Sequence, residues 1–235
     1  MSNGMFIVHE NMPEEASAIA QAVKNAFGIE STIEGIDLEG VFTPIPEFNG
    51  YQNSSTGLAL AIRKFKTDTG KGMEKAVFVL TPRDLYAGEV SKEDDWIFGY
   101  NIGEISVASG ARMKREDSQP SDILQVKKDL YLKRLTVLGV HEIGHDVIDR
   151  SYMQLATWVN TLTGHELLLG PHCTDNTCVM YEVVDIKTPK PTEGHMRLGT
   201  EKRFDAGLDD VIQRLRPDYL CNNCRSSVKV DANYR

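Results

Sequence analysis

The chain has 235 residues, of which 41% are hydrophobic and 26% are charged. This length and apolar content suit one domain with a sizeable core, so we expect residues 1–235 to form a single domain. With 26 Lys and Arg against 34 Asp and Glu, the formal net charge is -8. An acidic chain without a basic stretch lacks the electrostatic footprint of a nucleic-acid-binding protein, so we expect no nucleic-acid partner.

The chain also lacks the sequence signals of membrane insertion and export. No apolar run approaches the ~18 residues that a membrane-spanning helix needs. The N-terminus MSNGMFIVHENMPEE has no basic start of the kind found in secretory signals. We therefore expect no membrane partner and a cytoplasmic protein, in which the four cysteines are thiolates or metal ligands rather than disulfides. The sequence leaves the oligomeric state open.

The N-terminal half alternates between predicted strands and helices. Before the longest helix we expect strands at 6–10 and 75–82 and helices at 13–28 and 56–66. Residues 29–54 are rich in Gly, Pro, Asn and Ser and are expected to form a long loop. Residues 96–109 alternate around two glycines, which predicts a hairpin. A long helical pattern then starts near Ser121 and runs into the sequence HEIGH at 141–145.

The C-terminal half has a different pattern. It carries two predicted helices, at 152–163 and 201–216, with irregular sequence between them. Irregular chain near a metal site is often held together by the metal. We therefore expect an α+β fold in two parts, an N-terminal sheet and helix part over 1–145 and a C-terminal part over 146–235.

The sequence VLGVHEIGHDV, residues 137–147, carries the first candidate site. His141 and His145 are four residues apart, so on a helix both imidazoles lie on one face and can bind one zinc ion. Glu142 projects about 100° around the helix from His141, where it can accept a proton from an attacking water and pass it to a leaving amine. The alternative is an ordinary helix with two partly buried histidines.

Two cysteine pairs form the second candidate site. The spacing Cys173-x4-Cys178 together with Cys221-x2-Cys224 is typical of a closed structural zinc site with four thiolates. Two disulfides are the alternative.

The order of these motifs resembles that of the archaemetzincins, a family of zinc metallopeptidases in the metzincin clan. The family pattern HExxHxxGxxHC-x4-C-x-M followed by CxxC is matched by HEIGH (141–145), HCTDNTCVM (172–180) and CNNC (221–224). With upstream segments such as WIFGYN (96–101), the resemblance covers about residues 75–224. It implies a zincin-like mixed sheet with an active-site helix, and a C-terminal part organised around a four-cysteine zinc site.

The resemblance also implies a role for each matching residue. The catalytic zinc would be held by His141, His145 and His172. The structural zinc would be held by Cys173, Cys178, Cys221 and Cys224. Glu142 would be the general base, and Met180 would lie beneath the catalytic zinc. The implied cofactors are thus two Zn²⁺ ions, one catalytic and one structural, and the implied substrate is a peptide or protein.

The spacing after the second histidine departs from the family pattern. Ile148 and Ser151 stand where the family has its glycine and its third histidine. We expect the resulting insertion, residues 146–170, to continue the active helix or to form a helix near 152–163 that lies beside the cleft.

This insertion leaves three candidates for the third ligand. His172 is attached to the cysteine block and is the preferred one. Glu166 has the spacing of thermolysin-type enzymes, and His165 is adjacent to it.

Two hypotheses for the function follow. The first is a zinc metallopeptidase in which Glu142 activates water and the substrate lies along an edge strand of the N-terminal sheet. The second is a catalytically silent peptide-binding or scaffold protein of the same fold, stabilised by zinc. The two differ in whether the histidine site keeps an open position or is closed by a fourth protein ligand.

Overall fold

The computed structural model describes residues 4–45, 50–52, 61–65, 67–68, 76–86, 96–102, 105–111, 113, 121–183, 194–203 and 207–229. The chain divides into two compact units, the first ending at Asp146 and the second covering Val147–Lys229. The expected single domain over 1–235, with its two parts meeting between residues 145 and 146, stays a prediction.

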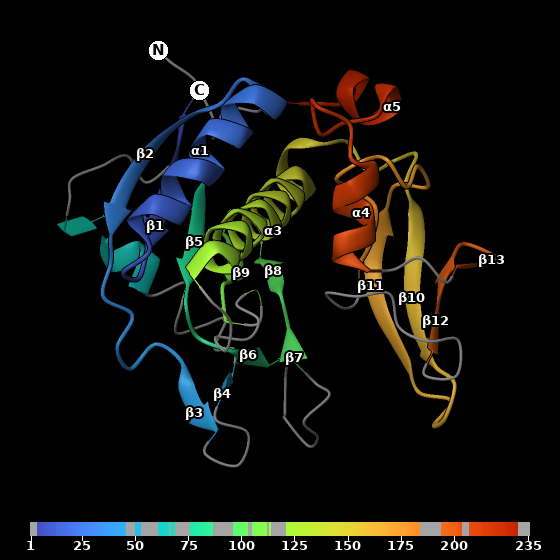
Figure 1. The fold of residues 1–235 in the computed structure, drawn as a ribbon, viewed down its shortest axis with the longest axis horizontal. Coiled ribbons are helices and arrows are strands. Elements are labelled where there is room, and N and C mark those ends of the chain that lie inside the picture. The colour runs from blue at the N-terminus through green and yellow to red at the C-terminus, as the bar shows by residue number, and fades with distance from the viewer. Residues whose placement is uncertain are drawn as a thin grey trace. The chain divides into compact units, whose positions relative to one another are not determined.

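The first unit is built on a five-stranded sheet with the strand order β2-β1-β5-β9-β8 (Figure 1). Its strands are β1 (Gly4–His9), β2 (Glu30–Gly35), β5 (Val77–Thr81), β8 (Gly99–Ile102) and β9 (Ile105–Ser109). The first four strands in this order are mutually parallel, and β8 is antiparallel to β9. The strands predicted at 6–10 and 75–82 and the hairpin predicted within 96–109 are thereby confirmed.

A second sheet in the same unit has short strands in the order β3-β4-β6-β7. These strands are β3 (Thr43–Ile45), β4 (Gly50–Gln52), β6 (Leu85–Tyr86) and β7 (Trp96–Ile97). The loop predicted over 29–54 is therefore wrong where β2, β3 and β4 form. Strand β2 has the polar sequence ESTIEG and is stabilised by parallel pairing with β1, a long-range contact that local composition does not reveal.

Helix α1 (Pro13–Phe27) confirms the helix predicted at 13–28. It begins with a proline, whose fixed φ suits the first helical turn. It ends at Gly28, which has a φ of 71° and donates its amide to the carbonyl of Lys24. Glycine adopts this left-handed conformation at little cost, which explains the position of the helix end.

Helix α3 (Ser121–Val147) confirms the long helix that runs into HEIGH. It packs against α1, with Gly139 of α3 facing Ile19 of α1. A Cβ added to Gly139 would lie 2.8 Å from the Ile19 side chain, so the close approach of the two helices needs glycine at this position. The Tyr131 hydroxyl donates to Glu15 of α1 at 3.2 Å. The two helices thus lie side by side within the first unit.

Apolar residues of alternating strand positions form the core of this unit. One cluster combines residues of the five-stranded sheet with residues of the segments between its strands. Its members are Phe6, Val8, Leu38, Phe42, Ile62, Val77, Val79, Leu85 and Val107. The intervening residues of β1 and β5 are buried as well, so side chains on both faces of these two strands are excluded from solvent. Residues 61–65, within the helix predicted at 56–66, are helical, and the rest of that segment lies outside the described residues.

In its described residues, the second unit has a four-stranded antiparallel sheet and two short helices. Its elements are β10 (Gln154–Asn160), β11 (Glu166–His172), β12 (Gly194–Leu198), β13 (Glu201–Arg203), α4 (Leu208–Arg214) and α5 (Asn222–Ser226), with the sheet order β11-β10-β12-β13 (Figure 1). Val211 of α4 packs in a small apolar cluster with Tyr181, which lies in the segment after β11, and with three residues of the sheet: Ala156, Met196 and Leu198.

The helix predicted at 152–163 is wrong, and so is the idea that the insertion 146–170 forms a helix after α3. These residues form β10 and most of β11, which are joined by a turn in which Gly164 has a φ of 69°. The β-branched and aromatic residues of β10 favour a strand, and Asn160 starts the turn by accepting the amides of Leu162 and Thr163. The helix predicted at 201–216 is confirmed only for its second half, α4.

Within the described ranges, none of the helices combines the length and the apolar composition needed to cross a bilayer.

Candidate metal centres

The first centre lies on the last two turns of α3. The Nε2 atoms of His141 and His145 are 3.1 Å apart, and their ring planes are nearly perpendicular at 82°. Two nitrogens bound to one zinc ion in tetrahedral geometry would be about 3.3 Å apart. His141 is buried and His145 is half-buried. The pair therefore fits a shared divalent cation without a change of side-chain conformation.

Glu142 lies on the same helix with its carboxylate against β8. It is 7% exposed, and a Cβ added to Gly99 of β8 would lie 2.8 Å from its Oε1 atom. Because Gly99 has no side chain, the Glu142 carboxylate fits beside the outer strand of the five-stranded sheet. This position is suited to a base that acts on a ligand held at that strand.

Sequence reasoning missed the residue that ties the end of α3 to the sheet. Asp146 accepts hydrogen bonds from Asn101 Nδ2 of β8 and, at 2.8 Å, from Ser106 Oγ of β9. Asn101 Nδ2 also donates to Ser106 Oγ at 3.0 Å. The signal was an aspartate directly after the second histidine, together with the asparagine of WIFGYN. This network holds the helical turn that carries His145 on the β8-β9 hairpin.

His172 lies at the end of β11 in the second unit and is 1% exposed. Its Nδ1 atom lies 3.1 Å from the carbonyl oxygen of Gly170. A carbonyl only accepts, so Nδ1 carries the hydrogen and Nε2 has a lone pair when the ring is neutral. This is the arrangement of a histidine prepared to ligate a metal through Nε2. The Nε2 atom faces the carboxylate of Glu182.

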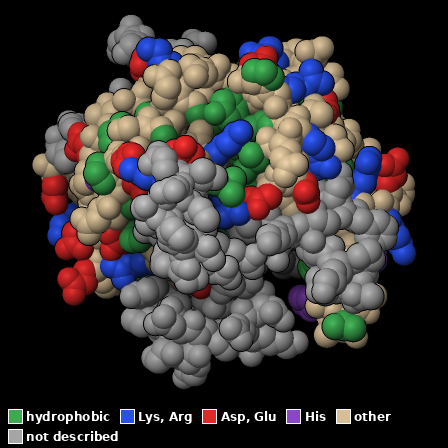
Figure 2. Space-filling model, viewed as in Figure 1, with side chains coloured by type: hydrophobic (Ala, Val, Ile, Leu, Met, Phe, Trp, Pro, Cys, Tyr) green, Lys and Arg blue, Asp and Glu red, His purple; other side chains and the backbone are tan. Residues whose placement is uncertain are grey.

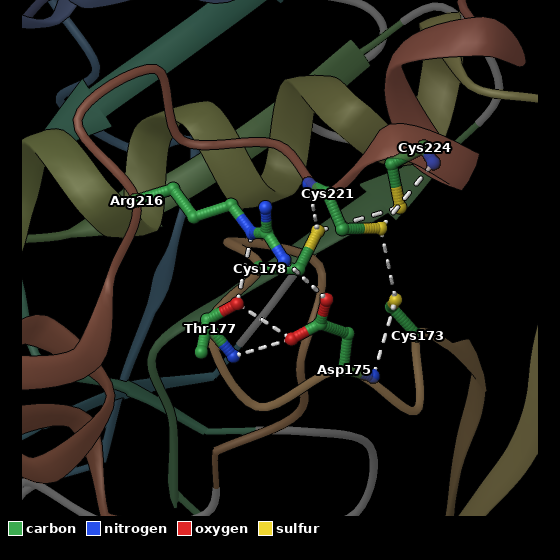
Figure 3. Close-up of polar contacts among 7 residues, drawn as sticks. All are labelled: Cys173, Asp175, Thr177, Cys178, Arg216, Cys221 and Cys224. Carbon is green, nitrogen blue, oxygen red and sulfur yellow. Dashed lines mark hydrogen bonds and ion pairs between the residues drawn. The ribbon is translucent and has the colours of Figure 1, made fainter.

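The second centre is the group of four cysteine sulfurs (Figure 3). Cys173, Cys178, Cys221 and Cys224 offer sulfur atoms that all lie within 4.8 Å of one another. Two of the distances are 3.7 Å and 3.4 Å, between Cys173 and Cys221 and between Cys178 and Cys224. Sulfurs around a tetrahedral zinc ion would be about 3.8 Å apart. All four cysteines are buried and none forms a disulfide.

Each of the four sulfurs receives one hydrogen-bond donor. The amides of Asp175, Cys221 and Cys224 donate to Cys173, Cys178 and Cys221 at 3.4 Å each. The Tyr152 hydroxyl donates to Cys224 at 2.8 Å. Donors of this kind stabilise negatively charged sulfur, so the surroundings suit thiolates.

The pKa values of the cysteines in the group are shifted in opposite directions. Hydrogen bonding by the Cys178 thiol lowers the pKa of Cys173 to about 3. Hydrogen bonding to the Cys173 sulfur raises the pKa of Cys178 and of Cys224, and repulsion from a neighbouring negative sulfur raises both further. A divalent cation among the sulfurs would remove this repulsion.

The loop between the first two cysteines is held from outside the group. The Asp175 carboxylate accepts the Thr177 amide at 2.9 Å and is paired with Arg216 at 3.2 Å (Figure 3). Arg216 also donates through Nε to the Thr177 hydroxyl at 2.9 Å. These bonds set the distance between Cys173 and Cys178.

The remaining residues singled out in the sequence lie elsewhere in the second unit. Glu166 is exposed and paired with Arg197 of β12 at 2.8 Å, and His165 is exposed in the turn before β11. Met180 is fully buried and its carbonyl accepts the Cys173 amide at 2.9 Å. Tyr181 is 1% exposed within the apolar cluster, so it is a packed tyrosine.

Comparison with known proteins gives matches to solved structures. No protein-family model and no curated protein matches the sequence. Three structures match at 17–20% identity with at least 96% of this chain covered. The archaemetzincin of Methanopyrus kandleri has a TM-score of 0.55 at 20% identity, with 92% of that chain covered. The archaemetzincin of Archaeoglobus fulgidus, solved with malonate, has a TM-score of 0.53 at 20% identity, with 99% covered.

The third structure is a zinc-dependent peptidase from Methanocorpusculum labreanum, which has a TM-score of 0.58 at 17% identity and is covered over its whole length. This chain has the archaemetzincin fold. The fold class predicted from the sequence is thereby confirmed, as an α+β structure with a mixed sheet, a long helix that carries the histidine pair, and a four-cysteine group. Residues 146–170, which the sequence predicts to be an insertion, contain β10 and most of β11.

Proposed function

We propose that this protein is a zinc-dependent metallopeptidase with two zinc ions, one catalytic and one structural. The observation that carries the proposal is the pair of converging nitrogens of His141 and His145 on the same helix as Glu142, whose buried carboxylate lies against the outer strand β8. The names of the proteins that share the fold, archaemetzincin and zinc-dependent peptidase, support this reaction class.

His172 is the third ligand of the catalytic zinc in this proposal. Its burial and the position of Nδ1 beside the Gly170 carbonyl support a metal bond through Nε2. The two alternatives have less support, because Glu166 is exposed and paired with Arg197, and His165 is exposed.

The structural zinc is bound by Cys173, Cys178, Cys221 and Cys224. Since Cys173 directly follows His172, the metal-bound sulfur fixes the backbone of the neighbouring catalytic ligand. The four donors to the sulfurs and the free, buried cysteines support this assignment.

Zinc, when bound, polarises the carbonyl of the scissile peptide and lowers the pKa of water. The chain's own base is Glu142, which accepts a proton from the attacking water at a carboxylate oxygen and delivers it to the leaving amine. Among the described residues no strand pairs with the outer side of β8, so an extended peptide can add to this edge beside Glu142.

The substrate in this proposal is a peptide or protein, and the location is the cytoplasm, since cysteines without disulfides are typical of reducing compartments. On the described part of the face in Figure 2, Lys and Arg side chains are interspersed with Asp and Glu side chains instead of gathering into a basic patch. This distribution and the net charge of -8 support a partner other than nucleic acid.

Replacement of the base tests the mechanism. Glu142→Gln keeps the size of the side chain but removes its basicity, so we expect kcat for peptide hydrolysis to fall by at least ~100-fold, with two zinc ions per chain retained by elemental analysis. Glu166→Gln is the matched control, the same change at an exposed position, and is expected to keep both turnover and zinc.

Two results would contradict the proposal. Turnover in Glu142→Gln equal to that of the unmodified protein would remove Glu142 from the mechanism. An unmodified protein with two zinc ions that cleaves no member of a diverse peptide library would favour the silent scaffold instead.

A further inference from the structure

Tyr152 provides a hydrogen bond to the cysteine group from outside it. Three of the sulfurs accept backbone amides from within the group's own loops, those of Asp175, Cys221 and Cys224 (Figure 3). The sulfur of Cys224 instead accepts the Tyr152 hydroxyl at 2.8 Å, across 72 positions of the sequence. Tyr152 lies between α3 and β10, in the segment that the sequence predicts to be an insertion. One of the four cysteines thus depends on a distant side chain for this bond.

The backbone that follows Cys224 is engaged in other hydrogen bonds. Cys224 lies in α5, where the amide of Arg225 donates to the carbonyl of Cys221 at 2.9 Å. The amide of Ser227 donates to the carbonyl of Cys224 at 3.1 Å. These amides close the short helix, so they bond to carbonyl oxygens instead of the sulfur. The Tyr152 hydroxyl supplies the donor that they do not.

Tyr152 is held near the sulfur because its own segment pairs with the residues after α5. Ile148 forms an antiparallel bridge with Val228. The amide of Asp149 donates to the carbonyl of Ser227 at 2.9 Å. Tyr152 itself is half-buried. The segment that carries the tyrosine is therefore attached to the segment that carries the cysteine, and the hydroxyl loses little further freedom when it bonds to the sulfur.

A hydrogen bond to a metal-bound sulfur affects both its position and its chemistry. A thiolate that binds zinc retains lone pairs that accept hydrogen bonds. A donor on one of these lone pairs orients the sulfur toward the metal and disperses part of its negative charge. The sulfur then reacts more slowly as a nucleophile with electrophiles other than the metal.

We propose that Tyr152 is a positioning residue of the structural zinc site, which orients the Cys224 sulfur and protects it from reaction. This inference rests on the proposed function, since it needs a metal ion among the four cysteines. It makes the segment between α3 and β10 part of the metal site, although all four ligands of the site come from other segments.

Tyr152→Phe tests this assignment, because it removes the hydroxyl and keeps the ring. The zinc-loaded variant and the unmodified protein are treated with iodoacetamide, and the reaction is stopped while at most one cysteine per chain is modified. Mass spectrometry of peptides then gives the reaction rate of each cysteine. We expect Cys224 to react at least about 10-fold faster in Tyr152→Phe, with the other three cysteines little changed. A merely structural role would raise all four rates together.

A spectroscopic measurement reports on the same bond in the folded protein. Co²⁺ bound to thiolates has charge-transfer bands in the near ultraviolet, which a site of imidazoles lacks. A hydrogen bond lowers the energy of the sulfur lone pair, so its loss in Tyr152→Phe should shift these bands to longer wavelength. The affinity of the cysteine site for zinc, titrated against a competing chelator, should fall by at least about 10-fold.

Tyr219→Phe is the matched control. Tyr219 is a half-buried tyrosine close to Cys221 in the sequence, and its hydroxyl is not among the four donors to the sulfurs. We expect this variant to match the unmodified protein in cysteine reactivity, Co²⁺ spectrum and zinc affinity.

The outcomes separate this inference from the proposed function. If the unmodified protein binds no metal at its cysteines, the structural zinc and the role of Tyr152 fail together. If it binds zinc there and Tyr152→Phe matches it in reactivity, spectrum and affinity, the structural zinc stands and the role of Tyr152 is wrong. An equal rise in the reaction rates of all four cysteines also overturns the role of Tyr152.

Discussion

At the scale of single residues, Gly99 determines how closely the sheet approaches Glu142, the proposed base. A Cβ at this position would lie 2.4 Å from the carbonyl oxygen of Val107 and 2.8 Å from Glu142 Oε1. The first contact is with backbone, so a side chain here cannot be accommodated by a rotamer change. Gly99, the glycine of WIFGYN, is thus needed both for β8 to pair closely with β9 and for the Glu142 carboxylate to lie against β8.

Gly99→Ala should therefore separate β8 from Glu142. We expect a loss of about 1–3 kcal/mol in the free energy of unfolding and a fall of at least ~10-fold in kcat/KM, because the outer strand moves relative to the base. Urea unfolding and peptide hydrolysis measure the two effects.

Gly35→Ala, at the end of β2, is the matched control. The nearest atom to its added Cβ is in the His9 side chain at 3.9 Å, an ordinary contact. If both variants behave alike, close packing at Gly99 is not what places Glu142.

At the scale of elements, the end of α3 is held on the β8-β9 hairpin by polar contacts. Asp146 accepts from both Asn101 and Ser106, and Ser106 lies 3.4 Å from the carbonyl of Glu142. Without these contacts the last turn of the helix, which carries His145, would be an ordinary fraying helix end. The strands of the hairpin therefore position the histidine pair as well as the base.

Asp146→Ala removes this attachment and leaves two buried or half-buried donors without their acceptor. We expect the free energy of unfolding to fall by about 1–3 kcal/mol, which urea denaturation measures. Asp129→Ala on the exposed side of the same helix should change it by less than about 0.5 kcal/mol. Equal effects of the two substitutions would show that Asp146 is only a surface residue.

The two long helices α1 and α3 and the local motifs were predictable from the sequence, whereas several strands were not. The helix through HEIGH and the cysteine pairs depend on spacings of two to five residues, which the sequence displays directly. Strand β2 forms by pairing with β1, which comes before α1 in the sequence, so its partner is more than 20 residues away along the chain. In β10, Thr157, Trp158 and Val159 favour a strand, whereas the lack of a helix breaker directly after His145 favours a helix, so the local sequence alone is ambiguous there.

At the scale of the whole molecule, the two units are stabilised in different ways. The central strands β1 and β5 of the first unit are buried on both faces, while the apolar cluster of the second unit is small. The second unit also contains four buried cysteine sulfurs whose charges repel one another in the absence of a cation. Its stability should therefore depend on metal more than that of the first unit does.

Removal of metal should unfold the second unit first. With a strong chelator in excess, we expect calorimetry to show a new transition at lower temperature, followed by the transition of the first unit. Added zinc should restore the original profile. A chelated protein that has lost its zinc and still unfolds in the same single transition would show that the cysteines do not stabilise the unit through a metal.

The division into two units and the third zinc ligand lie beyond what local sequence reasoning predicts. Both depend on contacts between distant residues, such as the pairing of Gln154 with His172 across the β10-β11 hairpin. The family pattern indicated His172 only through its attachment to Cys173.

The β10-β11 hairpin has a consequence for the recognition of related proteins. His172 pairs with Gln154 at the base of the hairpin, and the turn around Gly164 lies at its far end. Residues can be added to or removed from that tip in pairs without moving the base, so the number of residues between the helix histidines and His172 is free to drift. Proteins with this centre should be sought by the HC-x4-C block downstream of an HExxH helix, at any separation, instead of by a fixed count between the three histidines.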